Sequence, residues 1–172
     1  SANIKYAKEM QSQGIKLIFG SPQLKVHSKI CLIERKEDKV LKKYGFISTG
    51  NFNESTAKVY TDMTLFTSNK EVLNEVKLVF NFFGANYKKF SFKKLIVSPI
   101  NTEKNIKKLI NNEIKNAKIG KPAWIKIKVN NITSYSMIKS LYNASREGVK
   151  IQMIIRGAVS YTHLRAHETR IH

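Results

Sequence analysis

Apolar residues recur along the chain with two different spacings, and each spacing predicts one kind of secondary structure. Between residues 71 and 83, Val72, Val76 and Val79 follow the three-to-four-residue period of a helix. Short apolar runs that end at Gly, Pro, Ser or Asn predict strands instead. The predicted helices cover residues 4–13, 71–83, 102–117 and 135–146, and the predicted strands cover residues 15–19, 26–33, 44–48, 63–66, 125–129 and 149–155. This alternation predicts an α/β fold, with mixed sheets flanked by helices.

Two polar stretches interrupt this pattern. Residues 34–43 are rich in charge and predict a hairpin or a surface loop, and residues 84–94 predict a linker. Helices and strands resume after the linker. We therefore expect one domain over residues 1–90 and a second over residues 91–158.

The last fourteen residues, Val159 to His172, differ in composition from the rest of the chain. They hold no Lys, whereas residues 1–158 hold 26, and they hold three of the four His. The string VSYTHLRAHET resembles a translated transposase-type sequencing adapter. We therefore expect residues 159–172 to be an artefact and exclude them from fold and function, which leaves His27 as the only authentic histidine.

The net charge of the chain is +19 at pH 7, and an excess of this size attracts polyanions. Nucleic acid, an anionic membrane and polyphosphate are all candidates, and part of the excess is simply Lys on solvated helix faces. The charge alone does not choose between them. No apolar run approaches the roughly 20 residues needed to cross a bilayer, and the N-terminal sequence lacks the pattern of a secretory signal.

His27 and Lys29 form the first candidate site. Both lie in the strand predicted over residues 26–33, and residues two apart on a strand point to the same face. The spacing therefore predicts an imidazole beside an ammonium group. Because burial of a charge is unfavourable without a partner, this pair favours an anionic ligand.

The second candidate is the segment Ser48 to Asn53, with the sequence STGNFN. Gly50 allows close approach of the backbone, and successive N–H groups can hold anionic oxygens. Thr49, Asn51 and Asn53 add neutral hydrogen-bond donors. An ordinary polar turn is the alternative interpretation of this segment taken alone.

A His-x-Lys pair followed by a Gly-Asn turn resembles the phospholipase D superfamily. The likeness extends over five segments, which are LKVHSK (24–29), STGNFNESTAKVYTD (48–62), NEVKLVFNF (74–82), VSP (97–99) and IIRG (154–157). In order and spacing they resemble the C-terminal half of bacterial polyphosphate kinases of the phospholipase-D-like type. The resemblance implies truncated parts of two phospholipase-D-like domains, the later part of the first over residues 1–90 and the earlier part of the second over residues 91–158.

The resemblance also implies roles for individual residues. His27 falls on the family's phosphohistidine nucleophile, and Tyr60 and Arg156 fall on nucleotide-contacting positions. The superfamily pattern leads us to expect no metal ligand in this segment. It assigns catalytic roles to Lys29 and Asn51, and contacts with phosphoryl oxygens to Thr49, Gly50 and Asn53.

The implied activity is reversible transfer of the γ-phosphoryl group of ATP to polyphosphate through a phosphohistidine, with Mg²⁺ as cofactor. ATP or ADP and polyphosphate are then the partners, and no specific nucleic acid is expected. We expect the parent enzyme to be a cytoplasmic homo-oligomer, and peripheral association with a membrane stays open. The family's N-terminal domains and its magnesium-associated arginines fall outside residues 1–157, so we expect the chain alone to be an inactive fragment.

Two alternatives stay open from the sequence. A phospholipase-D-like phosphodiesterase or nuclease would share His27, Lys29 and Asn51, and a non-catalytic polyanion-binding or nucleic-acid-binding module would need only the charge. Two departures from the family pattern bear on the choice. Ser48 stands where the family usually has Gly, and Glu34 stands where the wider superfamily has Asp, which favours the kinase over the hydrolytic branch.

Overall fold

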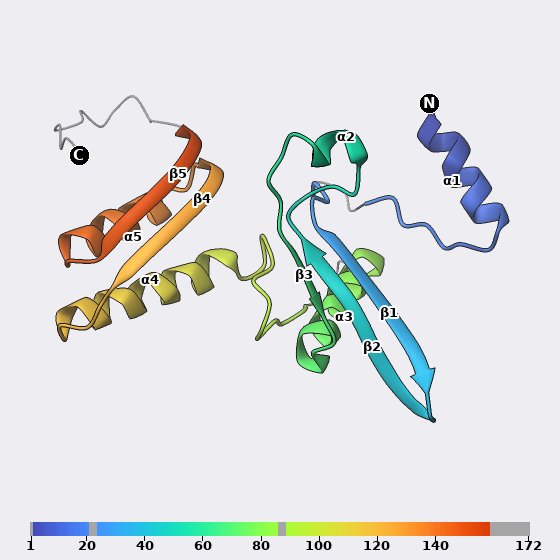
Figure 1. The fold of residues 1–172 in the computed structure, drawn as a ribbon, viewed down its shortest axis with the longest axis horizontal. Coiled ribbons are helices and arrows are strands. Elements are labelled where there is room, and N and C mark those ends of the chain that lie inside the picture. Colours follow the sequence, from blue (N-terminus) through green and yellow to red (C-terminus); the bar gives the residue numbers. More distant parts are fainter. Residues whose placement is uncertain (1, 21–23, 86–88, 159–172) are drawn as a thin grey trace. The chain divides into compact units, whose positions relative to one another are not determined.

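The computed structural model describes residues 2–20, 24–85 and 89–158 (Figure 1). The chain divides into two compact units, Ser1–Leu95 and Ile96–His172. The sequence places a domain boundary after residue 90, whereas the contacts within the chain divide it after Leu95. Each unit combines strands with helices, which confirms the predicted α/β class.

The first unit contains a three-stranded antiparallel sheet in the order β1-β2-β3. Its helix α3 packs on one face of β1 and β2. The strands are β1 (Lys29–Glu37), β2 (Val40–Ser48) and β3 (Thr64–Thr67), and the helices are α1 (Ala2–Ser12), α2 (Glu54–Ala57) and α3 (Lys70–Gly84).

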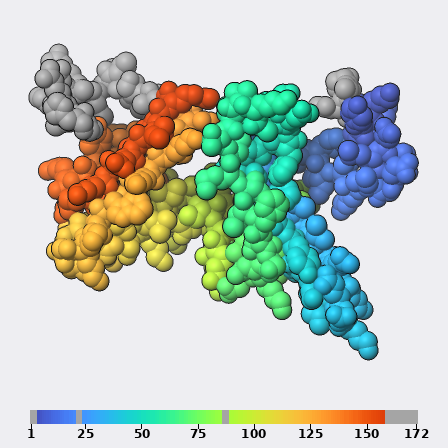
Figure 2. All heavy atoms as spheres, viewed as in Figure 1, coloured from blue at the N-terminus to red at the C-terminus, as the bar shows by residue number. Residues whose placement is uncertain are grey.

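The charged stretch predicted as a hairpin or loop is a long β-hairpin. β1 and β2 pair along their whole length, from Lys29 opposite Ser48 to Glu37 opposite Val40. Asp38 and Lys39 form the two-residue turn with φ angles of 49° and 66°, which matches the right-handed twist of the strands. In Figure 2 the tip of this hairpin, in light blue, projects from its unit.

One strand prediction in this unit is wrong, and another needs new bounds. The strand predicted over residues 26–33 is present as β1, but it begins at Lys29, whose partner Ser48 is the last residue of β2. Residues 15–19 form no strand, and Ile15, Ile18 and Phe19 are exposed. Within the described residues this run has no neighbouring strand to satisfy its backbone groups, and a strand needs such a partner.

Helix α3 buries one stripe of apolar residues against the sheet. Leu73 and Val76 are fully buried, and Val79 is nearly so. Gly45 of β2 makes this close packing possible, because a Cβ there would lie 2.3 Å from the carbonyl oxygen of Cys31 and 2.8 Å from Leu73. The Asn69 side chain begins the helix by accepting hydrogen bonds from the N–H groups of Glu71 and Val72.

A buried carboxylate ties residues 93–95 to this helix. The Glu75 Oε1 atom accepts hydrogen bonds from the backbone N–H groups of Lys93 (2.7 Å) and Lys94 (3.0 Å), and Oε2 accepts from Lys94 (2.9 Å) and Leu95 (2.7 Å). Burial alone would raise the pKa of Glu75, but these N–H groups together with the Lys94 charge lower it below its ordinary value. The end of the predicted linker is therefore anchored to the first unit.

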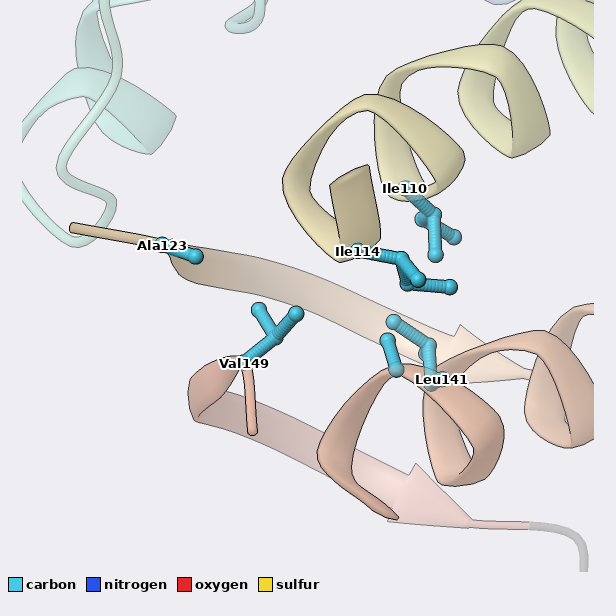
Figure 3. Packing of buried hydrophobic residues seen from close by; sticks show 6 residues of the cluster. Ile110, Ile114, Ala123, Leu141 and Val149 are labelled. Atoms are coloured by element: carbon cyan, nitrogen blue, oxygen red, sulfur yellow. The ribbon is translucent and has the colours of Figure 1, made fainter. Parts of the chain in front are cut away.

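The second unit is a β-α-β arrangement preceded by a helix. Its elements are α4 (Thr102–Lys118), β4 (Trp124–Ile132), α5 (Tyr135–Arg146) and β5 (Lys150–Ala158), and β4 and β5 pair in parallel. The apolar residues of α4 and α5 pack with the residues that directly precede β4 and β5 (Figure 3). This cluster consists of Ile110, Ile114, Ala123, Leu141, Ala144 and Val149. The predicted helix over residues 135–146 coincides with α5.

Among the residues that the structure describes, no helix is both long and apolar enough to span a bilayer. This agrees with the absence of a long apolar run in the sequence.

The carboxylate of Glu75 generates the first prediction. We expect Glu75→Gln to lower the free energy of unfolding of the 172-residue chain by about 1–3 kcal/mol at pH 7, because the amide cannot accept on both sides. The folded-state pKa lies below the unfolded value of 4.5, so this contribution is fully present above pH 4.5 and is lost as pH falls through the folded-state pKa. Urea unfolding at several pH values measures it.

Glu71→Gln is the matched control. Glu71 lies one turn earlier on α3 and pairs directly with the Lys94 ammonium at 2.9 Å, and both side chains are exposed. An exposed pair of this kind contributes about 0–1 kcal/mol. Equal losses for the two variants, or a loss for Glu75→Gln that does not shrink in acid, would contradict the backbone anchor.

Candidate functional site

Three segments of the first unit converge at one end of its sheet. Lys29, the first residue of β1, pairs with Ser48, the last residue of β2, and Ser48 also pairs with Thr64, the first residue of β3. The residues before Lys29, after Ser48 and before Thr64 therefore leave the sheet at the same end. These segments contain the His27-Lys29 pair, the Gly50-Asn51 turn and Tyr60.

His27 and Lys29 lie side by side, as predicted, although His27 lies just outside β1. The Lys29 Nζ atom is 3.1 Å from Nδ1 and 3.3 Å from Nε2 of His27, and it donates to the His27 carbonyl oxygen at 2.7 Å. His27 is exposed and Lys29 is half-buried. An ammonium group can only donate, so which ring nitrogen of His27 could accept from it depends on the tautomer of the ring.

Glu34, at the position of the superfamily's Asp, lies away from this pair. It is five residues further along β1, a rise of about 16 Å. Its carboxylate binds the ammonium groups of Lys77 (2.8 Å) and Lys43 (3.2 Å), which lower the pKa of Glu34, with the Lys77 hydrogen bond the larger cause. Glu34 therefore connects the hairpin to α3 instead of serving the candidate site.

The turn after β2 is fixed to the segment before β3. The N–H of Thr49 donates to the Met63 carbonyl at 3.0 Å, and the Thr49 hydroxyl donates to Asp62 Oδ1 at 2.9 Å and accepts from the Met63 N–H at 3.0 Å. Gly50 is buried against Asp62, and a Cβ at Gly50 would lie 2.1 Å from Oδ2 and 2.6 Å from Cβ of that residue. No side chain fits at Gly50 without displacing Asp62.

The turn ends in a short helix that the sequence analysis did not predict. Asn53 is the N-cap of α2, and its side-chain oxygen accepts from the Thr56 N–H at 3.1 Å. This hydrogen bond gives Asn53 a structural role that is distinct from the predicted contact with phosphoryl oxygens. Its amide NH₂ group remains chemically able to donate to an anion.

An open hollow of about 430 Å³ lies over the turn. Of the predicted residues, Gly50, Asn51, Asn53 and Tyr60 line it, and His27, Lys29 and Thr49 do not. Tyr60 is 59% exposed, so its ring is accessible to a ligand. The hollow is thus lined by backbone and side-chain amide groups, by the two aromatic residues Phe52 and Tyr60, and by the acidic residues Glu54 and Asp62.

Four polar residues of the hollow were not predicted as site residues, and these are Ser48, Glu54, Asp62 and Thr64. Asp62 lies in the segment VYTD, in which only Tyr60 was predicted to have a role. The Ser48 and Thr64 hydroxyls lie 2.8 Å apart, and Ser48 Oγ also accepts from the Gly50 N–H at 3.3 Å. Ser48, which stands in place of the family's Gly, thus supports the turn through its hydroxyl.

The carboxylates near the hollow do not form a metal site. Asp62 accepts from Thr49, and Glu54 pairs with Lys58 at 3.1 Å. In the part of the chain that the structure describes, no group of three or more His, Cys, Asp or Glu side chains is arranged to hold a metal ion.

Arg156 belongs to the second unit. It lies exposed near the end of β5, and the following residue, Gly157, gives room to the Asn131 side chain of β4, because a Cβ at Gly157 would lie 2.8 Å from Asn131 Oδ1. The predicted artefact at residues 159–172 lies outside the described residues.

Two family models match the chain. Residues 1–89 match the model described as polyphosphate kinase C-terminal domain 1, and residues 95–169 match polyphosphate kinase C-terminal domain 2. The second match continues into residues 159–169, so the expected adapter stays a prediction.

The chain spans less than a quarter of the length of the relatives described here. Polyphosphate kinase from Vibrio parahaemolyticus is 47% identical over 156 residues, which are 91% of this chain and 22% of that protein. Polyphosphate kinase from Escherichia coli K12 is 42% identical over 92% of this chain and 23% of that protein. The crystal structure of polyphosphate kinase from Porphyromonas gingivalis superposes with a TM-score of 0.80 at 35% identity, covering 90% of this chain and 24% of that one.

Gly50 generates the second prediction. We expect Gly50→Ala to lower the free energy of unfolding of the 172-residue chain by about 1–3 kcal/mol, because the new methyl group displaces Asp62 and breaks its hydrogen bond with Thr49. Thermal and urea unfolding measure the change.

Gly84→Ala is the control, since a Cβ there meets nothing within 4 Å and the residue ends α3. Alanine should leave the stability unchanged or raise it slightly at this position. If both variants are equally stable, the close packing of Gly50 against Asp62 does not support the turn.

Proposed function

Because the chain belongs to the polyphosphate kinase family, we propose that its parent protein transfers the γ-phosphoryl group of ATP reversibly to polyphosphate, with His27 as the covalent carrier. The observation that carries this proposal is the contact of the Lys29 ammonium with the His27 ring, at the sheet end where the Gly50 turn also emerges. The proposed nucleophile, cation and hydrogen-bond donors would then belong to segments that leave the sheet at the same end.

The reaction has two steps under this proposal. An unprotonated ring nitrogen of His27 forms a bond to the γ-phosphorus of ATP, the bond from that phosphorus to the β,γ-bridging oxygen breaks, and ADP leaves with the electron pair. A terminal oxygen of polyphosphate then bonds to the same phosphorus, and the phosphorus–nitrogen bond breaks, which returns the electron pair to His27. Covalent catalysis divides the transfer into two easier steps.

The described residues support this chemistry by position and charge. A loose phosphoryl transition state needs alignment and positive charge more than covalent assistance. Lys29 would place its ammonium beside the transferred group, and Asn51, with the backbone of Thr49 and Gly50 and the amide of Asn53, would donate to its oxygens. Tyr60 and, in the second unit, Arg156 are proposed for the nucleotide.

The described residues contain no group of three or more His, Cys, Asp or Glu side chains that could hold Mg²⁺ by themselves. We propose that it enters bound to the phosphates of ATP, since magnesium in such enzymes commonly keeps few protein ligands.

The phosphodiesterase alternative is disfavoured by Glu34. At the superfamily's acidic position this residue is held by Lys43 and Lys77, so it is not available to the His27 pair. Homo-oligomer formation, cytoplasmic location and association with a membrane stay predictions.

Replacement of His27 generates the third prediction. In the full-length parent protein, His27→Ala should abolish both the acid-labile phosphoenzyme formed from ATP and the synthesis of polyphosphate, because no other residue of the site can take the phosphoryl group onto a ring nitrogen. Radiolabelled γ-phosphate in acid- and alkali-quenched samples measures the first, and chain-length analysis measures the second.

Ser28→Ala is the neighbouring control and should retain both activities. The isolated 172-residue chain is a second control, which we propose to be inactive because it spans less than a quarter of the relatives' length. Persistence of an acid-labile phosphoenzyme in His27→Ala would refute the assigned nucleophile.

A further inference from the structure

The two faces of the β4–β5 sheet differ sharply in chemistry. Parallel sheets are usually covered on both faces, and their strands are then continuous apolar runs. In β4, Ile125 and Ile127 pack against the core cluster, whereas Trp124, Lys126 and Lys128 alternate with them and are exposed. This alternation suits a second face that meets solvent or a polar ligand, and does not suit a second apolar layer.

This second face, here named the basic face, carries four cations and no acid. It consists of Trp124, Lys126, Lys128 and Asn130 on β4 and Lys150, Gln152, Ile154 and Arg156 on β5, all of them exposed. Neither strand contains Asp or Glu. The described acidic residues of the second unit that form ion pairs lie on helix α4 and at the end of α5, where Glu103 binds Lys107 and Glu147 binds Lys118.

The cations of the basic face form an extended row. In the parallel register Trp124 lies beside Lys150, and Lys128 lies beside Ile154. Residues two apart on a strand are separated by about 6.6 Å, and adjacent strands by about 4.8 Å. Arg156 lies opposite residue 130, which is four residues beyond Lys126 on β4. The row from Lys126 to Arg156 therefore extends about 13 Å along the strands. In Figure 2 the orange and red atoms of β4 and β5 lie at the surface of the second unit in this view.

Resting on the proposed function, we propose that the basic face binds the inorganic polyphosphate chain. Polyphosphate repeats a negative charge at every phosphate, so one chain can contact several cations of the row together. Arg156 lies near the carboxyl ends of both strands, where parallel sheets commonly bind ligands, and the chain would extend from there along β4 past Lys128 and Lys126.

The same face is poorly suited to single-stranded nucleic acid. Binding of bases without sequence preference depends on several exposed aromatic rings on which they stack. The basic face has only Trp124, and the Lys126 ammonium already lies 5.3 Å from the centre of its ring. The charges of a phosphate chain thus match this surface, whereas bases would find few partners.

The double variant Lys126→Gln/Lys128→Gln in the full-length protein tests the proposal. We expect the KM for polyphosphate, measured in the direction that phosphorylates ADP, to rise about fivefold or more, the size expected from the loss of two exposed ion pairs. The rate of phosphoenzyme formation from ATP should stay within about twofold of the wild type, because neither Lys belongs to the His27 site.

Lys108→Gln/Lys115→Gln is the matched control. It removes the same charge from exposed positions two turns apart on α4, and it should leave the KM for polyphosphate unchanged. An equal rise in the KM for polyphosphate in this control would show a general effect of net charge. A parallel loss of phosphoenzyme formation in Lys126→Gln/Lys128→Gln would assign the face to the nucleotide. Either result would overturn the proposal.

Equilibrium binding separates this proposal from the proposed function. In a His27→Ala background, where no transfer is expected, labelled polyphosphate should still bind and should bind at least about fivefold more weakly when Lys126 and Lys128 are replaced. Weakening by the same factor for an oligothymidylate strand of equal charge would show an unselective polyanion surface and overturn the proposal. A wild type that forms no phosphoenzyme would refute the proposed function alone.

Discussion

The pairing of Lys29 with Ser48 is the constraint on which the candidate site depends. A sheet register that slips by one residue turns every side chain to the opposite face. Here the two-residue turn at Asp38 and Lys39 fixes the register at one end of the hairpin, and Gly45 fixes it at the middle by letting Leu73 of α3 pack directly on the strand. The positions of the side chains at the open end of the hairpin are therefore determined by contacts at the turn and at Gly45.

The polar residues of α3 extend this constraint to the rest of the unit. Asn74 accepts from the Lys43 ammonium at 2.6 Å, and Lys77 binds Glu34. Glu75, between them in sequence, holds the backbone of residues 93–95 instead. The segment NEVKLVFNF thus orients one helix against the hairpin and also fixes the chain where it leaves the first unit, only one residue before the unit that carries the basic face.

Local patterns in the sequence predict some of these features and not others. The helical period locates α5 at both ends, and the two-residue spacing of His27 and Lys29 predicts that their side chains meet. The start of β1 and the absence of a strand at residues 15–19 depend on whether a partner strand is present. The local sequence does not show whether such a partner exists. Asp62 escaped prediction for the same reason, because its contact with Thr49 joins residues thirteen positions apart and becomes visible only in the folded chain.

The proposed transfer requires that a ring nitrogen of His27 carries the phosphoryl group. The most direct measurement is the position of that group in the full-length protein, after brief reaction with ATP, an alkaline quench, proteolysis and mass spectrometry of the peptide that contains LKVHSK. We expect phosphoryl on His27 that disappears when ADP is added before the quench. Phosphoryl found on another residue, with the His27 peptide unmodified, would contradict it.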